Sequence, residues 1–263
     1  MERDRQNVSI TPIGLEVLER AKAILAASED LVEYADGAAK PMTATIRLGV
    51  IPTIAPFLLP QVLPEIRNRF PSLKITLRED LTANLLARLA DHQLDFALIA
   101  LPYDVNGLLV KELLNDEFWL VARADDPALK GKEVHLPAKM AERLLLLEEG
   151  HCLRDHSLQA CKRSDIRNAE GMEATSLLTL LQMVESGMGI ALLPEMAVRG
   201  GLLNNTELVA RPLATPTPKR VIALVARSST ARLEEFQVLS DCIQERFGAS
   251  IRISRGKRKG IRA

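Results

Sequence analysis

The chain has 263 residues, of which 47% are hydrophobic, 26% charged and 3% aromatic, and its formal net charge is zero at pH 7. This composition predicts a globular protein of one or two domains and excludes a uniformly basic body that would attract polyanions. The charged N-terminus has no secretory h-region, and no apolar run approaches the roughly 20 residues of a membrane span. We therefore expect a cytoplasmic protein with no membrane partner.

The N-terminal segment changes from an extended to a helical pattern. Residues 1–12 are polar and partly extended, and a helical pattern then continues to about Gly37. Leu18, Leu25 and Val32 recur every seven residues along it. Such a single apolar stripe fits either a linker helix that pairs with a second copy or a helix packed on its own domain. Periodicity alone leaves both open.

From residue 43 onward, strand patterns alternate with helix patterns of about ten to fifteen residues. The expected strands are residues 45–52, 73–80, 94–101, 117–123, 143–149, 189–194, 207–213 and 219–227. The expected helices are residues 55–71, 82–93, 176–187 and 229–247. This alternation predicts an α/β fold with mostly parallel sheets, either as one large sheet or as two lobes with a cleft. Ligands of such sheets bind beyond the carboxyl ends of the strands.

The stretch EEGHCLRDHSLQAC sets Cys152 and Cys161 nine positions apart, with His151 directly before the first. Free cysteine is most often a small apolar residue buried in the core, and this is the first interpretation. Zinc binding by these three residues and His156 has the right ligand types, but the spacing is poor and no CxxC pair is present. In a reducing compartment a redox-active pair is the third interpretation.

Residues around these cysteines and beyond carry a resemblance to a known family. The motif GHCLRD with its spaced second cysteine resembles the OxyR-type hydrogen-peroxide sensors of the LysR-type transcriptional regulators. ITPIGLEVLERAKAIL is similar to the end of the family's wing and its linker helix. The segments IRLGVIPTIAPFLLPQVLPEIRNRFPSLKITLRED and VESGMGIALLP are similar to the family's effector-binding domain. The resemblance runs from about residue 8 to 250.

The resemblance implies a two-lobed effector domain with the type 2 periplasmic-binding-protein fold, preceded by a long linker helix. The implied parts are a remnant of the wing at 1–12, a dimerising linker helix at 13–40, the effector domain at 43–250, and a basic disordered tail at 251–263. Within the effector domain, lobe I takes residues of about 43–115 and 219–250, and lobe II those of about 119–215. The recognition helix of the winged helix-turn-helix is expected to be missing from this chain.

The resemblance also assigns roles to individual residues. Cys152 matches the peroxidatic cysteine and Cys161 the resolving cysteine. Thr53, Thr82, His151 and Arg220 match residues that bind peroxide, while Asp155 and the neighbouring Arg154 are tuning residues. Simpler interpretations stay open for several of these positions. They are helix N-caps at Thr53 and Thr82, a surface ion pair at Arg220, and a charge on the first helical turn at Asp155. Cys242 is predicted to lie in the core, and His92 and His135 at the surface or in loops.

The chemistry implied by the resemblance needs a thiolate at Cys152, because a protonated thiol is a poor nucleophile toward the O–O bond. We expect His151, Arg220 and a helix start to stabilise that charge. If residues 153–161 are helical, the two cysteines lie about 13 Å apart along the axis. A disulfide requires Cα atoms within roughly 7 Å, so the helix must unwind for the bond to form.

The leading prediction is therefore a regulator that senses hydrogen peroxide and activates oxidative-stress genes, not an enzyme. Its expected partners are hydrogen peroxide, promoter DNA reached through the largely missing N-terminal domain, RNA polymerase, further copies in a homodimer or homotetramer, and glutaredoxin- or thioredoxin-type reductants. No metal or cofactor is expected. Two alternatives stay open, namely a LysR-type domain that binds a small metabolite in the cleft between the lobes, and a thiol peroxidase.

Overall fold

The computed structural model describes residues 2–4, 7–37, 42–129, 134, 142–161, 173–214 and 217–256. The helices are α1 (Pro12–Gly37), α2 (Ala55–Arg69), α3 (Thr82–Ala90), α5 (Cys152–Ala160), α6 (Leu177–Glu185), α7 (Glu195–Arg199), α8 (Leu233–Gly256) and the 3₁₀ helix η1 (Pro127–Leu129). The strands are β1 (Glu2–Asp4), β2 (Asn7–Ser9), β3 (Thr45–Val50), β4 (Lys74–Glu79), β5 (Phe96–Leu101), β6 (Leu108–Arg123), β7 (Leu146–Leu147), β8 (Glu173–Ala174), β9 (Ala191–Pro194), β10 (Leu208–Pro212) and β11 (Lys219–Arg227). The predicted surface residue His135 lies outside the described residues.

The main sheet has seven strands in the order β10-β6-β11-β5-β3-β4, with β9 also paired to β6. Within the described part of this sheet, the parallel pairs are β3 with β4 and β3 with β5. Strand β11 runs antiparallel to both β5 and β6, and β6 runs antiparallel to β9 and β10. The prediction of mostly parallel sheets is therefore wrong. The long strands β6 and β11 pair side by side in opposite directions, which the alternation of helices and strands along the chain does not reveal.

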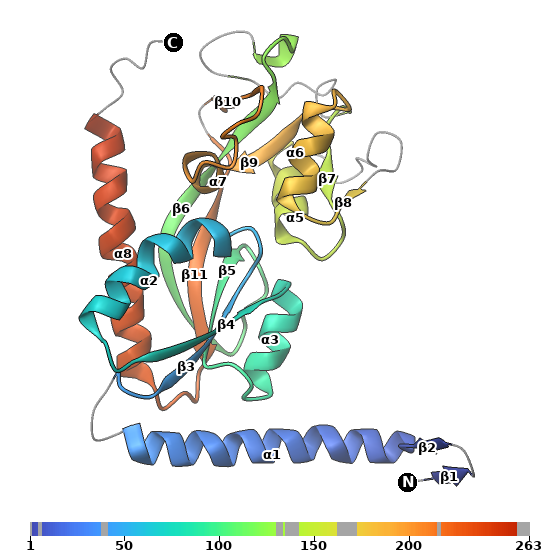
Figure 1. Cartoon of the computed structure of the whole chain (residues 1–263), viewed down its shortest axis with the longest axis vertical. Helices are drawn as coiled ribbons and strands as arrows, with labels where there is room; N and C mark the ends of the chain where they lie inside the picture. The colour runs from blue at the N-terminus through green and yellow to red at the C-terminus, as the bar shows by residue number, and fades with distance from the viewer. Residues whose placement is uncertain are drawn as a thin grey trace.

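Two groups of elements share these long strands (Figure 1). One group consists of β3, β4 and β5 with helices α2 and α3. The other consists of β9, β10 and the small β7–β8 pair with helices α5, α6 and α7. Strands β6 and β11 run through both groups, and α8 packs against α2 and β6. We call the first group lobe I and the second lobe II.

Burial follows from the apolar runs of the central strands. Strand β5 reads FALIAL and is buried over its first five residues, because sheet neighbours and helices cover both of its faces. Phe96 packs edge-on against Phe236 of α8, at a centroid separation of 5.6 Å. The expected strand at 143–149 contributes only the two residues of β7, although Leu144 also forms a bridge to Ile190.

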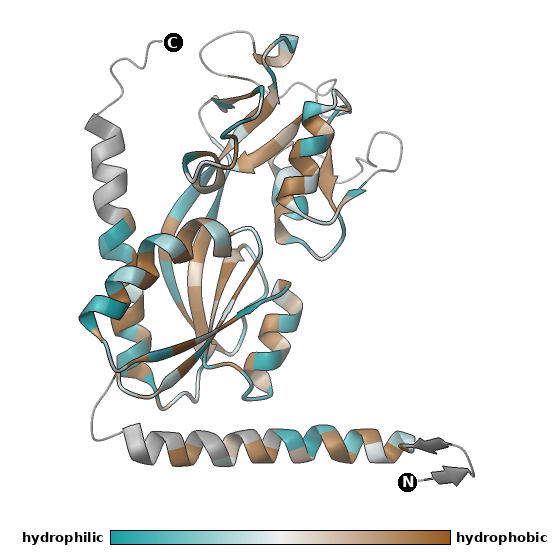
Figure 2. Cartoon of the chain, in the orientation of Figure 1, coloured by the Kyte–Doolittle hydropathy of each residue, from teal (hydrophilic) through white to brown (hydrophobic). Residues whose placement is uncertain are grey.

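Helix α1 lies outside both lobes and carries exposed apolar side chains (Figure 2). The most exposed are Ile13, Val17, Ile24, Leu25, Leu31 and Val32, each at 59–71% of full exposure. Burial of one such side chain stabilises a protein by about 1.5–3 kcal/mol. The apolar side chains of α1 therefore form a large hydrophobic surface that stays exposed to solvent in a single copy of the chain. No helix in the described ranges is both long and apolar enough to cross a membrane.

The C-terminal helix is longer than predicted. Helix α8 continues to Gly256, whereas the sequence predicts a helix that ends at residue 247 and a disordered tail from residue 251. The helix thus extends over residues 251–256 of that segment, and the disordered tail stays a prediction. No proline interrupts the segment, and each residue added to an existing helix gains a backbone hydrogen bond. The rest of the predicted tail lies outside the described residues.

Candidate functional site

The GHC motif forms the tight connection between β7 and α5. Gly150 has φ +94°, a conformation that L side chains rarely adopt. A Cβ at this position would lie 3.0 Å from Leu81 Cδ1 on lobe I, so glycine also permits the close approach of the two lobes here. The turn places His151 at the N-cap of α5 and Cys152 at the first helical position.

The opposing side of the site comes from the carboxyl ends of two parallel strands. Thr53 follows β3, and Leu81 and Thr82 follow β4. Together with the GHC motif they enclose a hollow of about 170 Å³ that has no position wide enough for a water-sized sphere. The lining residues are Ile51, Pro52, Thr53, Leu81, Thr82, Gly150, His151 and Cys152. A ligand, however small, would therefore bind there only after the surrounding side chains move apart.

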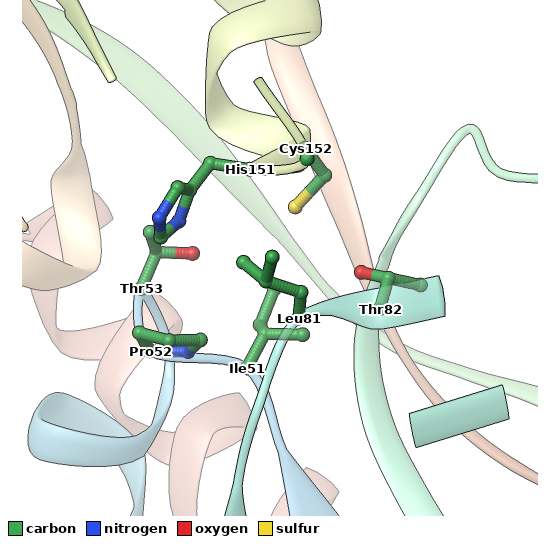
Figure 3. A pocket seen from close by; sticks show the side chains of 8 residues that line it. Ile51, Pro52, Thr53, Leu81, Thr82, His151 and Cys152 are labelled. Atoms are coloured by element: carbon green, nitrogen blue, oxygen red, sulfur yellow. The ribbon is translucent and has the colours of Figure 1, made fainter. Parts of the chain in front are cut away.

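Cys152 is 6% exposed, and its sulfur points into the space between Thr53 and Thr82 (Figure 3). Burial raises the pKa of this thiol. The Arg220 guanidinium and the Thr82 hydroxyl, which can donate to the sulfur once it is ionised, lower that pKa in part, and Asp155 raises it slightly. Desolvation outweighs the charges that favour ionisation, contrary to the prediction of a resting thiolate. The Cys152 thiol therefore lies next to groups that favour its ionised form, while burial favours the neutral form.

His151 does not provide the positive charge that the sequence suggests. Burial lowers the pKa of its imidazole, and the nearby carboxylate of Glu148, with Oε1 3.8 Å from Nε2, opposes this only in part. The ring is therefore neutral at pH 7, contrary to the prediction of a charge-stabilising role. A hydrogen bond to the Thr175 backbone also opposes the shift in part, so the neutral imidazole retains one ring nitrogen for a bound ligand.

Arg220 is completely buried and holds Thr53 in place. On the side away from the pocket, its Nε donates to Oδ2 of Asp116 at 3.0 Å, and Asp116 is 2% exposed. On the pocket side, Nη1 donates to Thr53 Oγ1 at 2.7 Å and Nη2 donates to the Thr53 carbonyl at 3.0 Å. The surface ion pair considered for Arg220 is wrong, because the pair is in the core. Since Thr53 Oγ1 accepts from Arg220, its own proton is free to be donated elsewhere.

The two threonines are not helix caps. The N-cap of α2 is Ile54 and that of α3 is Leu81, and neither helix start has a side-chain cap. Thr82 is 1% exposed, and its Oγ1 has no hydrogen-bond partner within the described part of the chain. A buried hydroxyl without a partner is unfavourable by about 1–3 kcal/mol, so it marks a position where a ligand or a thiolate is expected to bind.

Cys161 lies at the opposite end of α5 from Cys152. The helix has nine residues, Cys161 is its C-cap, and both cysteines are free. At 1.5 Å per residue the two Cα atoms are separated by about 13 Å along the axis, about twice the limit for a disulfide. The predicted helix between the cysteines is confirmed. Cys161 is half-buried, and burial raises the pKa of its thiol.

The two predicted tuning residues lie outside the pocket. Arg154 donates to the Leu147 carbonyl at 3.1 Å and pairs with Glu173, so it ties α5 to β7 and β8. Asp155 is exposed in the first turn of α5, where a carboxylate interacts favourably with the helix dipole. Neither of them is among the residues that line the hollow.

The remaining cysteine and two further histidines differ in their burial. Cys242 is fully buried in α8, as predicted, with Arg69 Nη1 3.6 Å from its sulfur. His156 is buried on α5, and His92 is intermediate in exposure beside α3. Within the described ranges, no three histidine, cysteine or acidic side chains gather closely enough to hold a metal ion.

Asp116 is the member of the site that sequence reasoning missed. It lies on β6 directly opposite Arg220 in the β6–β11 register, and its Oδ1 accepts from the Met196 backbone N–H at 2.9 Å. An aspartate within the strand LLNDEFWLVAR is a visible signal, because an unpaired charge in a buried strand is rare. Its partner depended on the antiparallel pairing, which was not predicted.

Comparisons with known proteins agree with this fold and site. The family model for the LysR substrate binding domain matches residues 39–248. A probable hydrogen peroxide-inducible genes activator of Streptomyces viridosporus is 39% identical over 93% of this chain and 79% of the relative. The HTH-type transcriptional regulator EstR of Acinetobacter baylyi is also 39% identical, over 93% of this chain and 81% of the relative.

Solved structures give the same result. The reduced regulatory domain of OxyR2 from Vibrio vulnificus superposes with a TM-score of 0.72 and 38% identity, over 79% of this chain and 97% of that one. A cysteine-to-serine variant of OxyR from Corynebacterium glutamicum with hydrogen peroxide bound gives 0.75 and 34% identity, over 99% of this chain and 84% of that one. The fold and site therefore define a LysR-type substrate-binding domain of the kind found in OxyR regulatory domains. The chain belongs to the LysR-type transcriptional regulator family.

Proposed function

We propose that this chain senses hydrogen peroxide through Cys152 and, as part of a LysR-type transcriptional regulator, activates oxidative-stress genes. The observation that carries the proposal is the position of the Cys152 sulfur. It is enclosed with two threonine hydroxyls and next to a buried arginine, while Cys161 lies at the far end of the same helix. Similarity to hydrogen peroxide-inducible genes activators and OxyR supports the proposal.

The pocket supplies what reduction of a peroxide requires. Hydrogen peroxide is small and both donates and accepts hydrogen bonds, as the hydroxyls of Thr53 and Thr82 do. Ionised Cys152 attacks one peroxide oxygen, the O–O bond breaks, and the thiol proton ends on the departing hydroxide to give water and a sulfenic acid at Cys152. The Cys161 thiol then attacks this sulfur, and a second water leaves as the disulfide forms. Arg220 and Thr82 favour the thiolate during the first step.

The second step requires α5 to unwind, because the cysteines lie about 13 Å apart in the helix. Cross-linking a loop of about ten residues alters the local stability of the segment by roughly 3 kcal/mol. Shifting a two-state equilibrium from 1:99 to 99:1 needs about 5.5 kcal/mol, so repacking of the side chains between Cys152 and Cys161 contributes the remainder. We propose that the oxidised arrangement of lobe II then changes how subunits pack.

The parts outside the effector domain fit a regulator. The β1–β2 hairpin pairs in the manner expected of the wing, and α1 has the exposed apolar stripe of a helix that pairs with a second copy. We propose the predicted domain boundaries, a homodimer or homotetramer, promoter DNA and RNA polymerase as partners, reset by glutaredoxin- or thioredoxin-type thiols, and a cytoplasmic location. The relatives are named as transcriptional regulators, not as enzymes.

A second candidate is a LysR-type regulator that responds to a small metabolite, with unreactive cysteines. It is favoured by the similarity to EstR, whose name refers to no peroxide. A thiol peroxidase would use the same first step but would turn over with a reductant. The exposed stripe of α1 favours a regulator over a peroxidase, since a monomeric enzyme has no use for such a helix.

Mass spectrometry after one equivalent of hydrogen peroxide tests the proposal. The wild-type chain should form a crosslink between Cys152 and Cys161. Cys152→Ser should abolish the crosslink, whereas Cys161→Ser should leave Cys152 as a sulfenic acid that oxidises further. Cys242→Ser is the matched control and should behave like the wild type, because Cys242 is buried in another element. Unmodified thiols in the wild type would leave the metabolite regulator ahead, and repeated turnover with thioredoxin would indicate the peroxidase.

A further inference from the structure

His156 lies one turn after Cys152 on α5, so the two side chains project from the same face of the helix. Its ring is 4% exposed, and Nε2 lies 3.4 Å from the Pro102 carbonyl. Pro102 directly follows β5 of lobe I, and the ring also lies beside Phe118 of β6, with centroids 6.4 Å apart. His156 therefore connects α5 to lobe I beside the contact that Cys152 makes.

This contact suits only the neutral imidazole. A carbonyl can only accept, so Nε2 carries the proton in the neutral ring and Nδ1 carries a lone pair. Nδ1 is buried and has no hydrogen-bond partner in the described part of the chain. A proton added at Nδ1 would create a buried cation with nothing to accept from its N–H, an unfavourable arrangement.

The surroundings of His156 favour the neutral form of its imidazole overall. Burial lowers the pKa of the imidazole, and the Arg220 guanidinium on β11 lowers it further. The Pro102 carbonyl and the Asp155 carboxylate on α5 raise it in part. The carboxylate of Asp116 on β6 is already bound to Arg220, and the Cys152 thiol is protonated at neutral pH.

We propose that His156 is a positioning residue that holds Cys152 in its pocket only while its ring is neutral, and that α5 binds a proton at His156 when it opens. This inference rests on the proposed function, because disulfide formation is the step that opens α5. Each thiol loses its proton in that step, the two sulfurs lose two electrons to the oxidant, and His156 gains one proton from solvent once its ring reaches water.

The sign follows from linkage. The imidazole has a pKa of about 6.5 when exposed and a lower one when α5 is closed. The closed arrangement therefore has its full stability above pH 6.5 and loses stability as the pH falls below it, since only the open form takes up the proton. Acidification thus favours the disulfide, by up to about tenfold per pH unit below the exposed pKa. The sensor would oxidise at a lower peroxide level in acid.

Equilibration of the full chain with reduced and oxidised glutathione, with a trace of glutaredoxin, isolates this effect. Glutathione gains the two protons that the protein thiols lose, so the equilibrium constant is insensitive to pH unless another group changes protonation. His156→Gln keeps a donor for the Pro102 carbonyl and removes the titration, and His156→Asn is a second such variant. His151, whose pKa is also lowered, contributes equally to the wild type and to these variants. His92→Gln is the control, since His92 follows α3 on lobe I.

The ratio of the wild-type constant to the His156→Gln constant should rise, by up to about tenfold, between pH 7.5 and 5.5. The same ratio against His92→Gln should stay flat. A flat ratio for both His156 variants, with the disulfide between Cys152 and Cys161 forming normally, would overturn the role of His156 and leave peroxide sensing intact. Absence of that disulfide in the wild type at every glutathione ratio would overturn both.

Discussion

Arg220 of β11 and Asp116 of β6 form an ion pair that is fully out of contact with solvent, at 3.0 Å, in the strands shared by the two lobes. Arg220 extends from this pair to Thr53 at the pocket, and Asp116 extends to the Met196 N–H at the start of α7. One buried pair therefore connects the pocket at Cys152 to lobe II. Buried pairs of this kind are sensitive to loss of one partner.

Asp116→Asn should lower the free energy of unfolding by about 3–5 kcal/mol, because it leaves the Arg220 charge buried without its counterion. Urea denaturation measures the loss. The double variant Asp116→Leu with Arg220→Met should recover most of that stability, since two apolar side chains replace both charges. This double variant should react with peroxide more slowly than the wild type, because Thr53 is no longer held and no guanidinium favours the thiolate. Equal stability of Asp116→Asn and the wild type would contradict this account.

Thr53→Val and Thr82→Val should separate stability from reactivity. Thr53 accepts a charged hydrogen bond, so its valine variant should be less stable by about 1.5–3 kcal/mol. Thr82 Oγ1 has no hydrogen-bond partner in the described part of the chain. The free energy of unfolding of Thr82→Val should therefore lie within about 0.5 kcal/mol of the wild-type value or slightly above it.

Both threonine variants should react more slowly with peroxide in stopped-flow measurements, because each removes a donor from the pocket. Thr179→Val, at the exposed start of α6, is a control that should leave the rate unchanged. A Thr82→Val protein with normal peroxide kinetics would remove Thr82 from the site.

The architecture and the pocket residues could be predicted to different depths. The apolar runs and the turn residues placed the helices and most strands. The motif GHCLRD pointed to Cys152, and the family resemblance assigned Thr53, Thr82 and Arg220. The charge state of Cys152 could not be predicted, because it depends on desolvation by side chains from both lobes. The partner of Arg220 depended on an antiparallel register between strands about one hundred positions apart, and local sequence contains no record of that pairing.

The reactivity of Cys152 should continue to rise at pH values above the pKa of an ordinary thiol. Burial raises the pKa of Cys152, so alkylation by iodoacetamide in a Cys161→Ser, Cys242→Ser background should have its midpoint above about 8.5. The same shift means that the folded chain favours the neutral thiol. Its contribution to stability is complete below pH 8.5 and declines above it, as the unfolded chain ionises.

Arg220→Gln should move the alkylation midpoint still higher, because Arg220 is the strongest group that lowers the Cys152 pKa. Lys219→Gln changes an exposed charge on the same strand and should leave the midpoint in place. A midpoint below 8 in the parent background would restore the resting thiolate that the structure argues against.

Gly150→Ala should disturb the site through the backbone. The residue has φ +94°, which is unfavourable by about 1–3 kcal/mol for an L side chain, and the new methyl group would press on Leu81 at 3.0 Å. Either relief, rotation of the peptide or movement of Leu81, displaces His151 and Cys152 from the start of α5. We expect a loss of unfolding free energy of about 1–3 kcal/mol and a slower reaction with peroxide, measured by urea denaturation and stopped-flow fluorescence.

Gly107→Ala is the matched control for the backbone effect, because Gly107 has φ +77° and open space around its Cα. It should lose similar stability and keep normal peroxide kinetics, since it lies far along the chain from both walls of the pocket. Slow kinetics in Gly150→Ala alone would therefore report the displaced thiol and not general instability. If both variants reacted equally fast with peroxide, the turn at Gly150 would be a structural feature without a part in positioning Cys152.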